Sequence, residues 1–121
     1  MTTATTKILV IEDEGDMRLL LDLILTAENV EVAHARSLAE AEASLKEEQP
    51  TLILLDNRLP DGFGVDFIGH IKQHCPGTKI IMISGIDRAA EDVALETGAD
   101  TFLSKPFTQR QLHQSIEKLL N

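Results

Sequence analysis

Acidic, hydroxyl and basic side chains in this sequence stand at the ends of short apolar runs. The residues in question are Glu12 and Asp13 after Ile8–Ile11, Asp56 after Leu52–Leu55, Ser84 after Ile80–Ile83, and Lys105 shortly after Thr101–Leu103. If the three carboxylates converge, they cannot all stay ionised without a counter-charge. A divalent cation together with the Lys105 ammonium would supply that charge.

Carboxylate oxygens are hard ligands that suit Mg²⁺, or alternatively Mn²⁺. The strand ends offer no Ser–His or Cys–His pair, so the available nucleophile is a carboxylate, and carboxylates attack phosphorus. A metal ion, a lysine and a hydroxyl around an aspartate are what phosphoryl transfer requires, because they neutralise charge and position the reacting groups. These residue types therefore point to phosphoryl chemistry.

Five short runs predict the strands that carry these residues, and three of them are continuously apolar, which is typical of strands covered on both faces. The runs are Ile8–Ile11, Val30–Ala33, Leu52–Leu55, Ile80–Ile83 and Thr101–Leu103.

Helical patterns lie between the strands. One predicted helix face carries Met17, Leu20, Leu21, Ile24 and Leu25. Capping boxes at Ser37–Glu40 and Thr108–Gln111 predict two helix starts, Asp87 is a candidate N-cap for a segment that stops at Gly98, and a further helix is expected from Val65 to about His74. The alternation predicts an α/β fold, a doubly wound (βα)5 domain with a five-stranded parallel sheet. Ligands of such sheets bind beyond the carboxyl ends of the strands.

Composition narrows the class of protein. The chain has 121 residues, which predicts one domain over residues 1–121 with a flexible tail at 1–6. Acids outnumber bases by 20 to 11 and neither Trp nor Tyr occurs, which disfavours direct binding of nucleic acid or of a membrane surface. A single cysteine excludes an intramolecular disulfide. The start lacks a signal-peptide pattern, so we expect a cytoplasmic protein.

Taken together and in order, these motifs resemble the receiver domain of a two-component response regulator, from Lys7 to about Leu120. The resemblance rests on the pair Glu12–Asp13, the segment Leu54–Pro60 with Asp56, the glycine at 64, the serine at 84, and Phe102–Pro106. It implies a flavodoxin-like fold with strand order 2-1-3-4-5.

The resemblance also implies a site. Asp56 would be the phosphoacceptor. Glu12, Asp13, Asp56 and the backbone carbonyl of Arg58 would hold Mg²⁺. Glu12 stands where aspartate is commoner in the family, and its extra methylene still allows it to reach a metal.

The same resemblance implies a switch. Lys105 would pair with the phosphoryl group, Ser84 would hydrogen-bond it, and Phe102 would rotate as Ser84 moves. Pro106 would follow a cis peptide bond. Gly85 stands where alanine is usual, a change that leaves space for the phosphoryl group.

The function implied is a phosphorylation-activated signalling switch and not an enzyme with an external substrate. A histidine kinase, a phosphotransfer protein or a small phosphodonor would phosphorylate Asp56. The face formed by the fourth helix, fifth strand and fifth helix would then bind a downstream partner, an output domain or a second copy of the chain.

Two alternatives remain open at this point. A haloacid-dehalogenase-type phosphohydrolase also uses a nucleophilic aspartate, but it needs an acid two residues later, where this chain has Arg58. A phosphorylation-independent interaction module would use only the surface. Phe63, Phe67 and Phe107 are expected to be packing residues.

Overall fold

A computed structural model describes residues 5–27, 29–85 and 88–120 of the chain. Its centre is a five-stranded parallel sheet in the order β2-β1-β3-β6-β7. These strands are β1 (Thr6–Ile11), β2 (Val30–Ala35), β3 (Leu52–Asp56), β6 (Lys79–Ser84) and β7 (Thr101–Ser104). Counted along the chain, the order is the expected 2-1-3-4-5, because the intervening β4 (Arg58–Leu59) and β5 (Gly62–Phe63) form a separate two-stranded hairpin.

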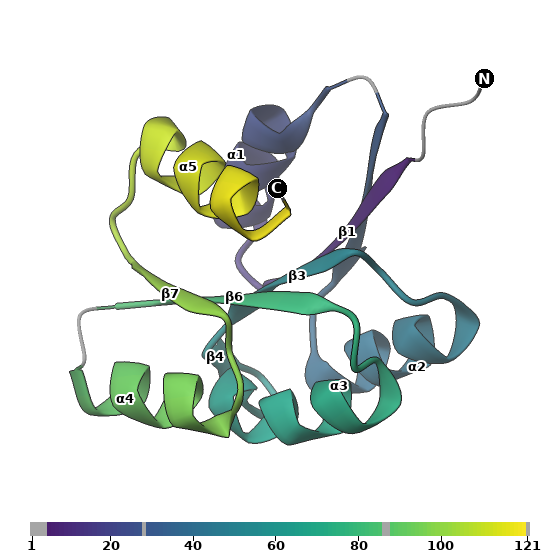
Figure 1. Ribbon diagram of the computed structural model, residues 1–121, viewed down its shortest axis with the longest axis vertical. Coiled ribbons are helices and arrows are strands. Elements are labelled where there is room, and N and C mark those ends of the chain that lie inside the picture. The colour runs from purple at the N-terminus through teal and green to yellow at the C-terminus, as the bar shows by residue number, and fades with distance from the viewer. Residues whose placement is uncertain (1–4, 28, 86–87, 121) are drawn as a thin grey trace.

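Helices cover both faces of the sheet, as Figure 1 shows: α1 and α5 lie on one face, and α2, α3 and α4 lie on the other. The helices are α1 (Gly15–Leu25), α2 (Leu38–Glu47), α3 (Ile68–His74), α4 (Arg88–Thr97) and α5 (Gln109–Leu120), and a 3-10 turn, η1 (Gly64–Phe67), precedes α3. Among the described residues, no helix combines the length and the apolar character needed to cross a bilayer.

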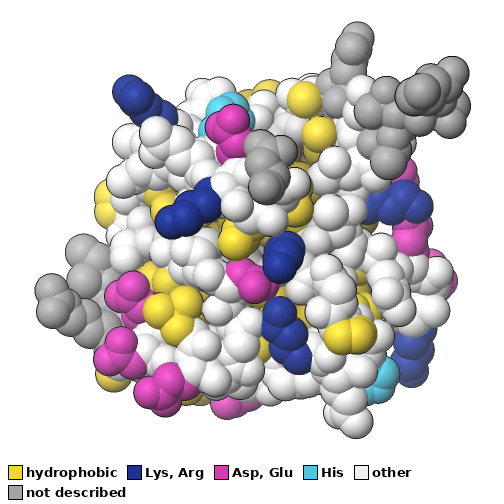
Figure 2. All heavy atoms as spheres, viewed as in Figure 1, with side chains coloured by type: hydrophobic (Ala, Val, Ile, Leu, Met, Phe, Trp, Pro, Cys, Tyr) yellow, Lys and Arg dark blue, Asp and Glu magenta, His cyan; other side chains and the backbone are white. Residues whose placement is uncertain are grey.

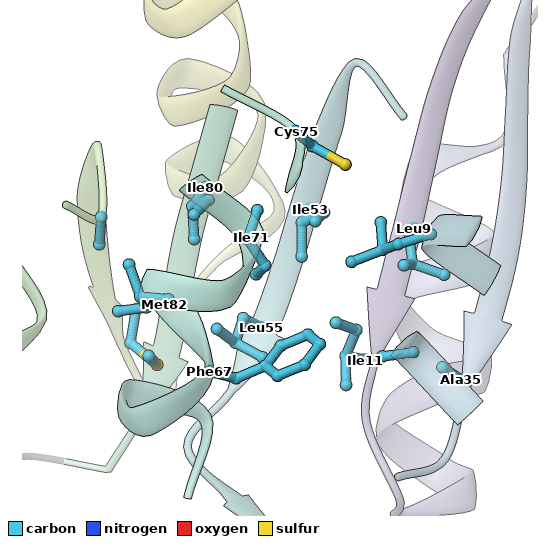
Figure 3. Close-up of a cluster of buried hydrophobic side chains, with 14 of the residues drawn as sticks. Leu9, Ile11, Ala35, Ile53, Leu55, Phe67, Ile71, Cys75, Ile80 and Met82 are labelled. Atoms are coloured by element: carbon cyan, nitrogen blue, oxygen red, sulfur yellow. The ribbon is translucent and has the colours of Figure 1, made fainter. Parts of the chain in front are cut away.

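The central strand β3 is buried along its whole length and divides its side chains between two cores. Ile53 and Leu55 join the cluster beneath α2, α3 and α4 that Figure 3 shows, whereas Leu52 and Leu54 join the cluster beneath α1 and α5. Each fully buried aliphatic side chain contributes roughly 2 kcal/mol from apolar burial. This alternation anchors β3, so its last residue, Asp56, is held at a defined edge of the sheet.

Both capping boxes begin helices as predicted. Ser37 Oγ accepts from the Glu40 N–H at 3.1 Å, although the Glu40 carboxylate accepts from the Arg36 N–H, one residue earlier than in the usual motif. Thr108 and Gln111 form the reciprocal pair, with distances of 3.0 and 2.8 Å. The proposed cap Asp87 lies outside the described residues.

Three expectations need correction. The tail was expected over residues 1–6, of which 1–4 lie outside the described residues, but Thr6 already begins β1 and its N–H donates to the Asn29 carbonyl at 2.7 Å. Leu20 does not belong to the buried face of α1, since 44% of it is exposed. The helix expected from Val65 starts instead as the 3-10 turn η1, because its first residues follow a tight hairpin.

That hairpin folds back against the end of β3. The Gly64 N–H donates to the Asn57 carbonyl at 2.7 Å, and the Val65 N–H donates to Asn57 Oδ1 at 3.0 Å. A Cβ atom on Gly64 would overlap the backbone carbonyl oxygen of Asp56 and would lie 3.0 Å from the Leu55 side chain. Only glycine allows the hairpin to approach Asp56 this closely.

We therefore expect Gly64→Ala to lower the free energy of unfolding by about 2 kcal/mol, because an added methyl group must push the backbone of Asp56 aside. The matched control is Gly69→Ala, on the exposed side of α3, where an added Cβ meets no atom within 4 Å. That change should stabilise the chain by about 0.5–1 kcal/mol through helix propensity. Urea denaturation measures both, and equal effects of the two substitutions would contradict the close approach.

Candidate functional site

The candidate site is built by backbone bonds that continue the sheet past its strand ends. The Glu12 N–H donates to the Ala35 carbonyl at 3.0 Å, and the Lys105 N–H donates to the Ser84 carbonyl at 2.7 Å. Asn57 N–H likewise donates to the carbonyl of residue 83 at 3.2 Å. These hydrogen bonds fix the backbone of the residues that follow the strands, and their side chains meet at one edge of the sheet.

Three carboxylates converge there, as the strand-end pattern predicted. One carboxylate oxygen from each of Glu12, Asp13 and Asp56 lies within 4.8 Å of the others. Glu12 and Asp56 are only 2% and 8% exposed, whereas Asp13 faces solvent. Like charges at this separation repel strongly when they are shielded from water.

Lys105 lies between the two buried acids. Its Nζ is 3.2 Å from Asp56 Oδ1 and 3.3 Å from Glu12 Oε1, within hydrogen-bonding reach of both. Burial of the ammonium opposes its charge, but the charges of Asp56 and Glu12 outweigh burial, so the pKa of Lys105 is raised. One ammonium cannot neutralise three carboxylates, which leaves the cluster with a net negative charge.

Glu12 shows the imbalance most clearly. Its Oε2 is buried and has no hydrogen-bond partner among the described residues. Burial, followed by the neighbouring Asp56 carboxylate, raises the pKa of Glu12 to about 8 despite the opposing effect of Lys105. A buried acceptor without a partner in an all-oxygen cluster fits a hard divalent cation, because such an ion would satisfy the oxygen and offset the excess charge.

A recess of about 580 Å³ opens beside the cluster. Asp56, Ser84 and Lys105 line it, and so do Arg58 and Phe63 from the hairpin. Ser84 is buried at the end of β6 and pairs in register with Ser104 of β7. The recess has room for a tetrahedral group next to a carboxylate, a hydroxyl and an ammonium.

The remaining predicted residues lie nearby. Phe102 is partly buried in β7 and packs against the core cluster beneath α4. The peptide bond between Lys105 and Pro106 is cis, which the resemblance implied. Arg58 lies on β4, is exposed to solvent and lines the recess. Their roles in signalling stay predictions.

The sequence predicted no contacts for two residues near the site, Asn57 and Asp61, and the wrong environment for a third, Phe63. Asn57 fastens the hairpin through its side chain and backbone. Asp61 accepts hydrogen bonds from the N–H groups of Leu38 and Ala39 at 2.8 and 3.0 Å, which lowers the pKa of Asp61 and ties the hairpin to the start of α2. Phe63 was expected to be a packing residue, but it is 54% exposed at the mouth of the recess. No local pattern signals these contacts, because each depends on how the hairpin folds back.

We expect the stability of the metal-free protein to fall as the pH rises from 4.5 to about 8. In that window the unfolded chain has lost the Glu12 proton whereas the folded chain retains it, so the stabilising effect is full below the unfolded pKa and is lost as the folded pKa is passed.

Urea unfolding with a chelator present, at roughly pH 5 and roughly pH 8.5, would measure the loss. Glu12→Gln, which cannot ionise, should flatten this part of the profile. The same pH slope in both proteins would show that another group titrates.

Comparison with known proteins places this geometry in a family. Residues 8–117 match the family model described as "Response regulator receiver domain". The chain is 37% identical over 117 residues to the response regulator protein PilR of Pseudomonas aeruginosa, and 34% identical over 117 residues to the phosphate regulon transcriptional regulatory protein PhoB of Escherichia coli. Each match covers 94% of this chain, but only 26% of PilR and 51% of PhoB.

The fold has solved counterparts as well. The structure of a CheY-like response regulator receiver domain protein from Methanospirillum hungatei superposes with a TM-score of 0.89 at 31% identity, covering 96% of this chain and 94% of that one. The family match, the sequence relatives and the shared fold agree with the site geometry. The chain belongs to the response regulator receiver domain family.

Proposed function

We propose that this domain is a phosphorylation-activated switch in which Asp56 accepts a phosphoryl group. The observation that carries the proposal is the position of the Asp56 carboxylate, which lies at the floor of an open recess, 3.2 Å from the Lys105 ammonium and beside two further carboxylates. A carboxylate nucleophile with an adjacent cation and an open approach is suited to in-line attack on phosphorus.

Some residues of the site would hold a metal ion, and others would contact the oxygens of the phosphoryl group. Glu12, Asp13, Asp56 and the backbone carbonyl of Arg58 would hold Mg²⁺, or alternatively Mn²⁺. The bound ion would offset charge on the transferring phosphoryl oxygens. Lys105 would pair with one of those oxygens, and the Ser84 hydroxyl at the recess wall would donate a hydrogen bond to another.

Phosphorylation would act by shifting a population between two existing arrangements. The added group carries nearly two negative charges, so it favours the arrangement in which Ser84 and Lys105 approach it. Ser84 ends β6, and the chain then passes through exposed Gly85 toward α4. Movement of Ser84 would make room for Phe102, and the face of α4, β7 and α5 would change shape.

The chemistry of the partners follows from this switch. A histidine kinase, a phosphotransfer protein or a small phosphodonor would supply the phosphoryl group, and a downstream protein, an output domain or a second copy of the chain would read the altered face. Acidic residues outnumber basic residues by 20 to 11, and Figure 2 shows acidic side chains among the Lys and Arg side chains on one face. This charge balance supports protein partners over direct nucleic-acid binding. The domain would catalyse only its own phosphorylation and dephosphorylation, in the cytoplasm.

The test is the intact mass of the protein after incubation with Mg²⁺ and acetyl phosphate. We expect one phosphoryl adduct, because Asp56 is the one carboxylate among the described residues of the recess wall with an ammonium within hydrogen-bond distance. Asp56→Asn and a chelator-treated sample should each abolish the adduct.

A beryllofluoride complex, detected by fluorine NMR, guards against an adduct too short-lived to observe. Neither adduct nor complex on the folded, Mg²⁺-supplied protein would overturn the proposal in favour of the phosphorylation-independent interaction module.

A further inference from the structure

Phe63 is an aromatic side chain that the core does not use. Phe63 is 54% exposed, whereas Phe67 is only 7% exposed and packs in the cluster beneath α3. Phe63 lines the recess that contains Asp56, Ser84 and Lys105. Asp56 and Ser84 are buried at the floor of this recess, so the exposed Phe63 stands at its rim.

The hairpin fixes the distance between Phe63 and the nucleophile. Gly64, the next residue, is pressed against the backbone of Asp56, and its N–H donates to the Asn57 carbonyl at 2.7 Å. Phe63 itself pairs with Arg58 across β4 and β5, and residues paired directly across two antiparallel strands project from the same face. The backbone around Phe63 is thereby tied to the end of β3 through Gly64 and to β4 through Arg58.

In-line transfer of the phosphoryl group to Asp56 would place the leaving group at this rim. When an Asp56 oxygen attacks phosphorus, the leaving group departs from the opposite side, away from the buried floor and toward the opening. We propose that the Phe63 ring stacks against the leaving group when that group is an imidazole, so that this residue favours N-phosphorylated imidazole donors over donors without a ring. The inference rests on the proposed phosphorylation of Asp56.

The reaction at this contact balances without another reactant. One oxygen of the Asp56 carboxylate forms a bond to phosphorus while the P–N bond breaks, and its electron pair goes to the ring nitrogen. A phosphoimidazole that is protonated on its second nitrogen leaves as neutral imidazole, and Asp56 becomes an acyl phosphate. Stacking between two flat rings would act on this step without contributing an atom to it.

Three small phosphodonors distinguish the effect of the leaving group's ring from the effect of the type of bond that breaks. Phosphoimidazole has a P–N bond and a ring, phosphoramidate has a P–N bond and no ring, and acetyl phosphate has neither. With Mg²⁺ present, Phe63→Leu should lower the second-order rate constant for phosphoimidazole about fivefold, as expected for the loss of one stacked aromatic contact. The rates with the other two donors should stay unchanged, and Phe63→Trp should retain the wild-type preference.

Leu23→Ala is the matched control, because Leu23 is an exposed apolar residue on α1, 68% accessible and outside the recess. It should change no rate. An equal loss for all three donors in Phe63→Leu, or no loss for any, would overturn the inference while leaving phosphorylation intact. If the wild-type protein accepts a phosphoryl group from none of the three donors, the proposed function is overturned, and the inference with it.

Discussion

The Lys105 ammonium, held between the buried carboxylates of Glu12 and Asp56, is the interaction on which the site depends. Its two contacts, at 3.3 and 3.2 Å, join residues that lie 93 and 49 positions away in the chain. Removing the ammonium would leave two buried acids without compensation, which costs several kcal/mol in typical proteins. The cluster could hold a cation as well, because a third carboxylate lies nearby and Glu12 Oε2 has no hydrogen-bond partner among the described residues.

The charged residues Glu12, Asp56 and Lys105 cannot hold themselves together, so the sheet must position them. Each of the three residues follows or ends a strand whose apolar side chains are packed between two layers of helices. The ladder continues past β1, β3 and β7 through backbone hydrogen bonds, so the charged side chains are positioned by the core and not by their own attraction. The acids are thereby held close together at the edge of the sheet, where a bound cation would offset their charge.

Sequence patterns predicted the elements and the strand-end residues well, because both follow from local rules. Continuous apolar runs such as Leu52–Leu55 identify buried strands, and parallel strands bring their carboxyl ends to one edge. Convergence of Glu12, Asp13 and Asp56 followed from that argument. The family resemblance, not periodicity, supplied the predicted roles of these residues.

What sequence could not predict is the path of the hairpin after β3. The contacts of Asp61 with the start of α2, of Asn57 with Val65, and the exposure of Phe63 all depend on a tertiary fold-back. Leu20 illustrates the same limit on α1, since a periodic pattern defines a helix face but not how far the neighbouring layer extends over it. The residues at the rim of the recess could therefore be identified only from the three-dimensional structure.

The most direct measurement of the central claim is a calorimetric titration of the folded domain with Mg²⁺. A cluster of three carboxylates and one ammonium should bind one ion, and Asp13→Asn should weaken that binding by at least about tenfold because it removes a charged ligand. Glu14 is another exposed acid that lines the recess, but it lies outside the convergent trio, so Glu14→Gln should leave the affinity nearly unchanged. No binding to the wild-type protein, or an equal loss in the two variants, would contradict the account.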